Sequence, residues 1–258
     1  MSFLEIQGHR IEYEMTVGAP MLVFLHEGLG SVAMWKDFPA RCVEATGCGA
    51  LIYSRYSYGK SDPLGEPRRV SFMHDEALNA LPELLGKLGV ERPILFGHSD
   101  GASIALIHAG GAGRPVRGLI LMAPHVMVEE IGIRRIEQAK LAYESTDLRE
   151  KLARYHADAD SAFRGWNEIW LDPDFRAWNI EEYLPRIACP VLAIQGEDDE
   201  YGTMEQIERI ERAIPQAEVL KLKACGHSPH RDQPDAVIER VVEFVNGIRS
   251  DHVGQRVI

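Results

Sequence analysis

An apolar run, Pro93–Gly97, leads through the sequence HSDG into a helix-like stretch, ASIALIHAG, that ends at Gly110. The first run has the length of a buried strand. Between the two, Ser99 has a glycine two positions before it and another two positions after it. Glycines at these places leave room for a sharp turn from strand to helix, with a strained backbone at the serine. The stretch therefore predicts a strand–turn–helix unit that projects the Ser99 hydroxyl at the carboxyl edge of a sheet.

Strand-sized apolar runs alternate with amphipathic helical segments along most of the chain. Residues 3–6 and 10–15 predict an antiparallel hairpin around Gln7–Gly8–His9. Six further runs are predicted to be buried parallel strands: residues 21–25, 49–54, 93–97, 116–122, 190–196 and 217–222. We expect the main helices at residues 35–45, 72–88 and 235–248. This pattern predicts an α/β fold with a mostly parallel eight-stranded sheet flanked by helices.

One connection, between the run that ends at Met122 and the run that begins at Pro190, is far longer than the ~10–12 residues that a crossover needs. Its sequence is helical and rich in aromatic residues. We therefore expect a helical cap subdomain at residues 126–185. The core domain would then consist of residues 1–125 and 186–258.

The composition limits the class of partner. The chain has 258 residues and a formal net charge of -11 at pH 7. Because this charge repels nucleic-acid phosphates and anionic lipid, we expect a small-molecule substrate and neither a nucleic-acid nor a membrane partner. No apolar run approaches the ~20 residues of a membrane helix, and the N-terminus has no basic signal-peptide region, which predicts a cytoplasmic protein. The oligomeric state stays open.

The four cysteines are scattered and lack paired metal-ligand spacing: Cys42, Cys48, Cys189 and Cys225. We expect them to be reduced structural thiols, and we expect no metal and no cofactor.

A serine is a poor nucleophile unless a base and an orienting acid lie beside it in space. The predicted strand at residues 190–196 is followed by the acidic loop GEDDE, which contains Asp198 and Asp199. The next predicted strand is followed by the glycine-containing turn CGHSPH, which contains His227. The order serine, acid, histidine along the chain is the order expected of α/β-hydrolases.

The sequence resembles the α/β-hydrolase superfamily over essentially its whole length. The motifs that carry the resemblance are FLHEGLGS, YSRYSYGKSDP, GHSDG, QGEDDEYG and CGHSPHRDQP. The resemblance implies a helical cap after the sixth of eight strands. It also implies Ser99 as nucleophile, His227 as general base and then acid, and Asp199 as the orienting acid, with Asp198 as the alternative.

The resemblance further implies an oxyanion hole made of two backbone N–H groups, those of Gly28 and Asp100. Glu27 stands where glycine is common in the family, so its backbone must avoid left-handed angles. Asp100 begins a predicted helix, where a carboxylate is favourable. Alternatively, Asp100 and Glu27 make the entrance to the site acidic, which would suit a neutral or cationic substrate.

The substrate pocket has further candidate residues. His125 follows a predicted strand at the edge of the sheet where ligands bind. Phe163, Trp166 and Trp170 share one helical face of the expected cap. With Glu27, these are the candidate pocket residues, and the three aromatic side chains predict an apolar, aromatic-lined slot. His98 is expected to point away from Ser99.

The leading functional hypothesis is a serine hydrolase, a carboxylesterase-like enzyme that cleaves an ester or thioester of a small hydrophobic or aromatic substrate through a Ser99 acyl-enzyme. One alternative is a carbon–carbon bond hydrolase of ring-cleavage products. Such anionic substrates call for an arginine, and the candidates are Arg134, Arg135 and Arg164. An alternative of another class is a non-catalytic small-ligand receptor on the same fold.

Overall fold

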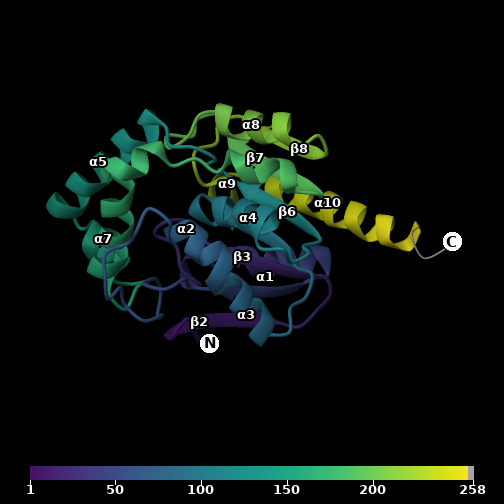
Figure 1. Ribbon diagram of the computed structural model, residues 1–258, viewed down its shortest axis with the longest axis horizontal. Coiled ribbons are helices and arrows are strands. Elements are labelled where there is room, and N and C mark those ends of the chain that lie inside the picture. The colour runs from purple at the N-terminus through teal and green to yellow at the C-terminus, as the bar shows by residue number, and fades with distance from the viewer. Residues whose placement is uncertain (255–258) are drawn as a thin grey trace.

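The computed structural model describes residues 1–254, and an eight-stranded sheet forms its centre (Figure 1). The strands lie in the order β1-β2-β4-β3-β5-β6-β7-β8. Their bounds are β1 Ser2–Ile6, β2 His9–Thr16, β3 Met21–Leu25, β4 Gly49–Tyr53, β5 Ile94–His98, β6 Gly118–Met122, β7 Val191–Gly196 and β8 Ala217–Leu222. β2 pairs antiparallel with β1 and with β4, and the other neighbouring strands pair parallel. The hairpin and the mostly parallel sheet that the sequence predicts are confirmed.

The two faces of the sheet belong to different cores, because successive residues of a strand point to opposite sides. In β5, Leu95 packs into one core, whereas Ile94 and Phe96 pack into the other. The face of Ile94 and Phe96 is covered by α1 (Phe38–Thr46) and α10 (Pro234–Gly254). The face of Leu95 is covered by α4 (Asp100–Gly111), by α8 (Glu205–Ala213) and by the helical residues 72–87. The buried apolar strands are therefore explained by helices on both sides.

The helix expected at residues 72–88 forms, but its middle is a π-helix. It consists of α2 (Phe72–Asp75), the π-helix η2 (Glu76–Ala80) and α3 (Leu81–Lys87). Pro82 stands at the start of α3 and has no N–H to donate to the preceding turn. The α-helical ladder is therefore interrupted immediately before this proline.

Two other helices differ from the expected bounds. α1 begins at Phe38, because the preceding Lys36 has a φ of 54° and separates it from the short 3-10 helix η1 (Ala33–Trp35). α10 continues to Gly254, six residues beyond the expected end at Ile248. The short helix α9 (Pro229–Asp232) precedes it.

The long connection between β6 and β7 is helical, as its sequence suggests. It contains α5 (Glu130–Ser145), α6 (Leu148–Leu152), α7 (Ala159–Trp170) and the 3-10 helices η3 (Pro173–Ala177) and η4 (Glu181–Arg186). The N-cap of α7 is Asp158, whose side chain accepts a hydrogen bond from the backbone N–H of Ser161. Figure 1 shows α5 and α7 together on the left, at the opposite end of the molecule from the end of α10. The division into a core at residues 1–125 and 186–258 and a cap at residues 126–185 stays a prediction.

The loop that follows β4 is bound to the beginning of α7. The backbone N–H of Leu64 donates to Ser161 Oγ at 2.7 Å. The backbone N–H of Gly59 donates to His156 Nδ1 at 3.0 Å, and the carbonyl of Gly59 accepts from the N–H of Ala157 at 2.7 Å. A loop from the first half of the chain thus holds the N-terminal end of α7 and the residues just before it.

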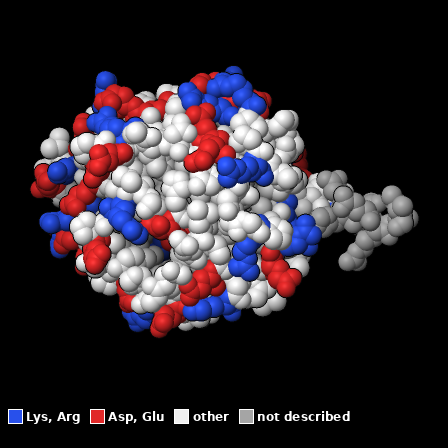
Figure 2. All heavy atoms as spheres, in the orientation of Figure 1, with Lys and Arg blue, Asp and Glu red and all other residues white. Residues whose placement is uncertain are grey.

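The four cysteines are free thiols. Within residues 1–254, no helix combines the length and the apolar character needed to cross a membrane. On the face seen in Figure 2, acidic and basic side chains are interspersed despite the net negative charge.

Candidate active site

Ser99 lies at the sharp turn between β5 and α4, with φ 53° and ψ −120°. Two glycines make this turn possible. A Cβ atom on Gly97 would lie 2.4 Å from Ala102 Cα, and a Cβ atom on Gly101 would lie 2.0 Å from the carbonyl oxygen of Leu25. The strained turn therefore holds the Ser99 side chain at the carboxyl end of β5, as the motif predicts.

The structure brings Ser99, His227 and Asp199 into one hydrogen-bonded line. Ser99 Oγ lies 2.9 Å from His227 Nε2. On the other side of the ring, His227 Nδ1 lies 2.8 Å from Asp199 Oδ1 and 2.9 Å from Oδ2. All three residues are buried. In this arrangement, a histidine that donates from Nδ1 can accept the proton of the serine at Nε2.

Asp199 is held in place by neighbours other than the histidine. Its Oδ1 accepts from the backbone N–H groups of Tyr201 (2.8 Å) and Gly202 (3.2 Å), and its Oδ2 accepts from Gln195 Nε2 at 2.8 Å. Asp198, the alternative acid, is exposed, and its carboxylate makes no hydrogen bond to His227 within the described residues. The structure thus places Asp199, and not Asp198, against His227.

The pair has mutually shifted pKa values. Burial is the largest single influence on Asp199 and would raise its pKa, but the charge and hydrogen bond of His227, together with the N–H of Tyr201, lower the pKa overall. Burial is the largest single influence on His227 and would lower its pKa, but the charge and hydrogen bond of Asp199, together with the charges of Glu27 and Glu200, raise the pKa above the ordinary value of 6.5. The carboxylate therefore stays ionised and stabilises the imidazolium form of the ring.

Gly28 and Asp100, whose backbone N–H groups are the predicted oxyanion donors, line the same cavity as Ser99. Within the described residues, neither N–H donates a hydrogen bond to another group of the protein. Free donors at this position suit a negatively charged oxygen. Gly28 has no space for a side chain, because a Cβ atom would lie 2.2 Å from the Trp166 ring. Glu27, which precedes Gly28, has no positive φ, so its backbone avoids left-handed angles, as expected for a residue with a side chain.

The Asp100 side chain is buried and bridges two parts of the molecule. Its Oδ1 accepts from Trp170 Nε1 at 3.2 Å, and its Oδ2 lies 3.8 Å from Arg55 Nη2. Burial raises the pKa of Asp100, although the charge of Arg55 opposes this shift. Among the described residues, the carboxylate makes no capping hydrogen bond at the start of α4; it connects α4 to α7 and lines the cavity next to Ser99.

The cavity over Ser99 has a volume of about 210 Å³. Four of the five tentative pocket residues line it: Glu27, His125, Trp166 and Trp170. Phe163 does not, and its inclusion was wrong. Its ring stacks on Tyr143 of α5, with ring centroids 3.8 Å apart and an angle of 8° between the planes. Helical periodicity places Phe163 on the buried face of α7, but α5 covers that end of the face.

Six further lining residues were missed from the sequence: Leu29, Gly132, Ile136, Glu200, Tyr201 and Ser228. Glu200 and Tyr201 directly follow Asp199, and Ser228 follows His227, so adjacency to the predicted acid and base was a usable signal. Gly132 and Ile136 belong to α5, and only the docking of α5 brings them to the cavity.

Three carboxylates line the cavity, those of Glu27, Asp100 and Glu200. Their basic partners stand outside the lining: Arg231 Nη2 lies 3.1 Å from Glu27 Oε1, and Arg135 Nη2 lies 3.9 Å from Glu200 Oε1. Within the described residues, the lining includes no lysine or arginine, and so none of Arg134, Arg135 and Arg164.

The histidines around the site differ in role. His125 lines the cavity, and burial lowers its pKa to about 3. His98 points away from Ser99, as expected, and its Nε2 donates to the carbonyl of His227 at 2.7 Å. Burial lowers the pKa of His98 to about 4. Both rings are therefore neutral near pH 7, and His227 is the basic histidine of this cluster.

The chain is similar in sequence and in fold to known proteins. The chain is 25% identical to a 2-hydroxy-6-oxononadienedioate/2-hydroxy-6-oxononatrienedioate hydrolase of Cupriavidus pinatubonensis, over 88% of this chain and 87% of that protein. Its fold is similar to that of a thermophilic esterase from Thermogutta terrifontis, with a TM-score of 0.74 and 19% identity, covering 96% of this chain and 99% of that one. It is also similar to an enol-lactonase from Burkholderia xenovorans, with a TM-score of 0.75 and 20% identity, covering 95% of this chain and 100% of that one.

The family model described as "Alpha/beta hydrolase family" matches residues 22–240, which is most of the chain. The protein therefore belongs to the alpha/beta hydrolase family and is a hydrolase.

Proposed function

We propose that this protein is a serine hydrolase that cleaves an ester or thioester of a small, neutral, hydrophobic or aromatic substrate. The observation that carries the proposal is the hydrogen-bonded line from Ser99 Oγ through His227 to Asp199, with the free N–H groups of Gly28 and Asp100 beside it. A nucleophile, a base, an orienting acid and paired N–H donors are the parts that acyl transfer needs.

The geometry supports a two-step reaction. Ser99 Oγ attacks the acyl carbon while its proton passes to His227 Nε2, and the carbonyl oxygen, now negative, accepts from the Gly28 and Asp100 N–H groups. His227 then gives the proton to the leaving oxygen or sulfur, and the acyl group stays on Ser99. A water molecule, deprotonated by His227, releases the acid and restores Ser99. Asp199 holds the ring in the required tautomer and stabilises its charged form.

The size, shape and charge of the cavity support the substrate class. A volume of about 210 Å³ suits a small acyl or alcohol part, and Trp166, Trp170 and Tyr201 offer aromatic surface. Carboxylates without a lining cation disfavour an anionic substrate. We also propose that residues 126–185 act as a cap, because α5 and α7 supply one wall of this cavity.

Hydrolysis of a carbon–carbon bond is the second candidate, because curated relatives at about a quarter identity are named as ring-cleavage-product hydrolases. Their names describe dicarboxylate substrates. The lining of the Ser99 cavity provides no arginine or lysine among the described residues to receive such carboxylates. The cavity therefore supports the ester or thioester reaction better.

A probe and a substrate panel test the proposal together. We expect a fluorophosphonate probe to label the wild-type protein and not Ser99→Ala, and we expect Ser99→Ala to lose at least about 10³-fold in kcat while keeping its circular dichroism spectrum. The panel consists of 4-nitrophenyl esters, acyl thioesters and a ring-cleavage dienoate. Near-wild-type turnover by purified Ser99→Ala would reject the mechanism. Turnover of the dienoate alone would favour the second candidate.

A further inference from the structure

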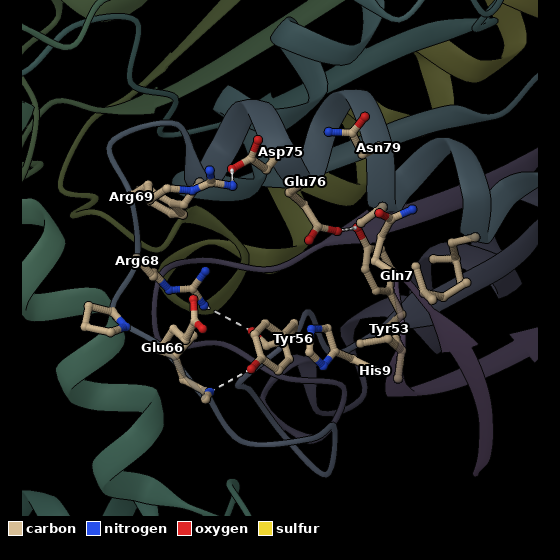
Figure 3. Close-up of a pocket in the computed structure, with 18 residues that line it drawn as sticks. Gln7, His9, Tyr53, Tyr56, Glu66, Arg68, Arg69, Asp75, Glu76 and Asn79 are labelled. Carbon is tan, nitrogen blue, oxygen red and sulfur yellow. Dashed lines mark hydrogen bonds and ion pairs between the residues drawn. The ribbon is translucent and has the colours of Figure 1, made fainter.

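A second cavity, of about 690 Å³, lies outside the Ser99 site (Figure 3). Its walls come from the hairpin β1–β2, from β4 and the loop that follows it, and from α2, η2 and α3. Its lining shares no residue with that of the Ser99 cavity. Its volume is in the range of small-molecule sites.

Aromatic and apolar side chains form much of its wall. Tyr53, Tyr56 and Phe72 line it, together with apolar residues such as Ile6 and Leu84. The Tyr56 ring is held by stacking on His9, with centroids 3.7 Å apart and 14° between the planes, and Tyr56 Oη accepts from the N–H of Gly65 at 2.7 Å. The aromatic wall is thus fixed in place and suits a planar ligand.

Arg68 supplies a positive charge without an acidic partner. Its Nη2 donates to the Tyr56 carbonyl at 3.1 Å and to Ser57 Oγ at 2.6 Å, and its Nε is buried without a hydrogen-bond partner. Within residues 1–254, no carboxylate forms an ion pair with Arg68. The next residue, Arg69, also lines the cavity, but it is exposed and its charge is paired with Asp75, another lining residue, at 3.4 Å. A half-buried guanidinium with spare donors is suited to a carboxylate ligand.

Glu76 lines the same cavity from the π-helix η2, and Figure 3 shows it with Tyr53 on the opposite side from Arg68. Its Oε1 accepts from Tyr53 Oη at 2.7 Å. Burial raises the pKa of Glu76, which favours its neutral acid form and reduces its repulsion of an anion. Single π-helical turns occur frequently at functional sites.

We propose that this cavity is a second ligand site, which binds a small aromatic carboxylate. The carboxylate pairs with the guanidinium of Arg68, the ring lies against Tyr53 and Tyr56, and a polar substituent reaches the Glu76–Tyr53 pair. The proposal does not depend on the reaction at Ser99, because the two cavities have separate linings.

Isothermal titration calorimetry with trans-cinnamate tests the site. We expect saturable 1:1 binding to the wild-type protein, and binding at least about tenfold weaker to Arg68→Gln, because a hydrogen bond to a charged partner is lost. Arg92→Gln is the matched control: it removes the same charge at an exposed position outside both cavity linings and should change Kd less than twofold. Cinnamyl alcohol, which has the ring without the charge, should bind at least tenfold more weakly than cinnamate.

Arg68 also packs on the rings of Tyr58 and Phe72, so Arg68→Gln removes packing as well as charge. A second variant therefore separates a loss of binding from a loss of folding. Ala80→Trp leaves Arg68 in place and fills the cavity from η2. It should abolish cinnamate binding while keeping the wild-type circular dichroism spectrum. The proposal is overturned if wild-type protein does not bind cinnamate at millimolar concentration. It is also overturned if folded Arg68→Gln or Ala80→Trp binds as tightly as wild type, or if Arg92→Gln weakens binding as much as Arg68→Gln.

Discussion

Both carboxylate oxygens of Asp199 accept hydrogen bonds from groups other than His227, and two of those donors are backbone N–H groups. Backbone donors fix the direction of the carboxylate without costing side-chain entropy. The carboxylate therefore determines which nitrogen of His227 faces Ser99. At the scale of single residues, the choice between Asp198 and Asp199 follows from this anchoring, since Asp198 is exposed.

The first residue-scale prediction concerns these two neighbours. Asp199→Asn should lower kcat/KM for an ester by about 10³- to 10⁴-fold, because the amide no longer favours the tautomer that accepts a proton at Nε2. Asp198→Asn, the matched control one residue earlier, should stay within about twofold, in line with small effects at exposed sites. Steady-state kinetics on both purified variants make the comparison. Equal losses would contradict the assignment.

The second residue-scale prediction concerns pH. His227 acts as a base only when neutral, and its pKa lies above the ordinary value of 6.5 because Asp199 favours the charged ring. Activity should therefore be lost as pH falls through that raised pKa. The midpoint of the kcat/KM profile should lie above pH 6.5 in the wild type. It should move to lower pH in the residual activity of Asp199→Asn, and an unmoved midpoint would show that another group controls the profile.

At the scale of elements, α7 joins the helical segment to the catalytic centre. Trp166 closes over Gly28, and Trp170 donates to Asp100 at the start of α4. Phe163, one turn earlier on the same face, is covered by Tyr143 of α5 instead. The 3.6-residue period of the sequence predicts one buried face for α7, but it contains no information on which neighbour buries each turn.

The element-scale prediction follows from the Trp170–Asp100 contact. Trp170→Phe should reduce the free energy of unfolding by about 1–3 kcal/mol, because it leaves a buried carboxylate oxygen without its donor. Trp166→Phe truncates a tryptophan of the same helix whose Nε1 makes no hydrogen bond within the described residues, so it should cost less. Urea denaturation of both variants gives the comparison. Similar losses in the two variants would mean that packing, rather than this hydrogen bond, holds α7 in place.

At the scale of the whole molecule, the sheet was the most predictable part. Runs such as Met21–Leu25 and Val191–Ile194 are apolar at every position because helices cover both faces, and that pattern is visible in one sequence. The Ser99 turn was equally visible, since its glycines are required locally. The π-helical turn and the second cavity were not predicted. The cavity is formed where a hairpin, a loop and a helix meet, and each of these has an ordinary sequence.

The prediction at the scale of the whole molecule concerns the charge of the substrate. The chain carries a net charge of -11, and carboxylates line the Ser99 cavity. We expect kcat/KM for 4-acetoxybenzoate to be at least about tenfold below that for the neutral 4-acetoxybenzamide, after correction for their reactivity toward hydroxide. Added salt should narrow the difference, because it screens the repulsion. A preference for the anion would instead support dienoate-like substrates.

The hydrogen bonds between α7 and the loop after β4 limit how the Ser99 cavity can open. Leu64 and Gly59 fasten the start of α7 to the half of the molecule that contains β4. A hinge-like swing of the whole helical segment would therefore have to carry that loop with it or break these bonds. Thermal fluctuations that open the cavity should be easier at α5, where Gly132 and Ile136 border it. The route by which substrate enters and acid leaves would then run past α5, while α7 remains seated over the nucleophile.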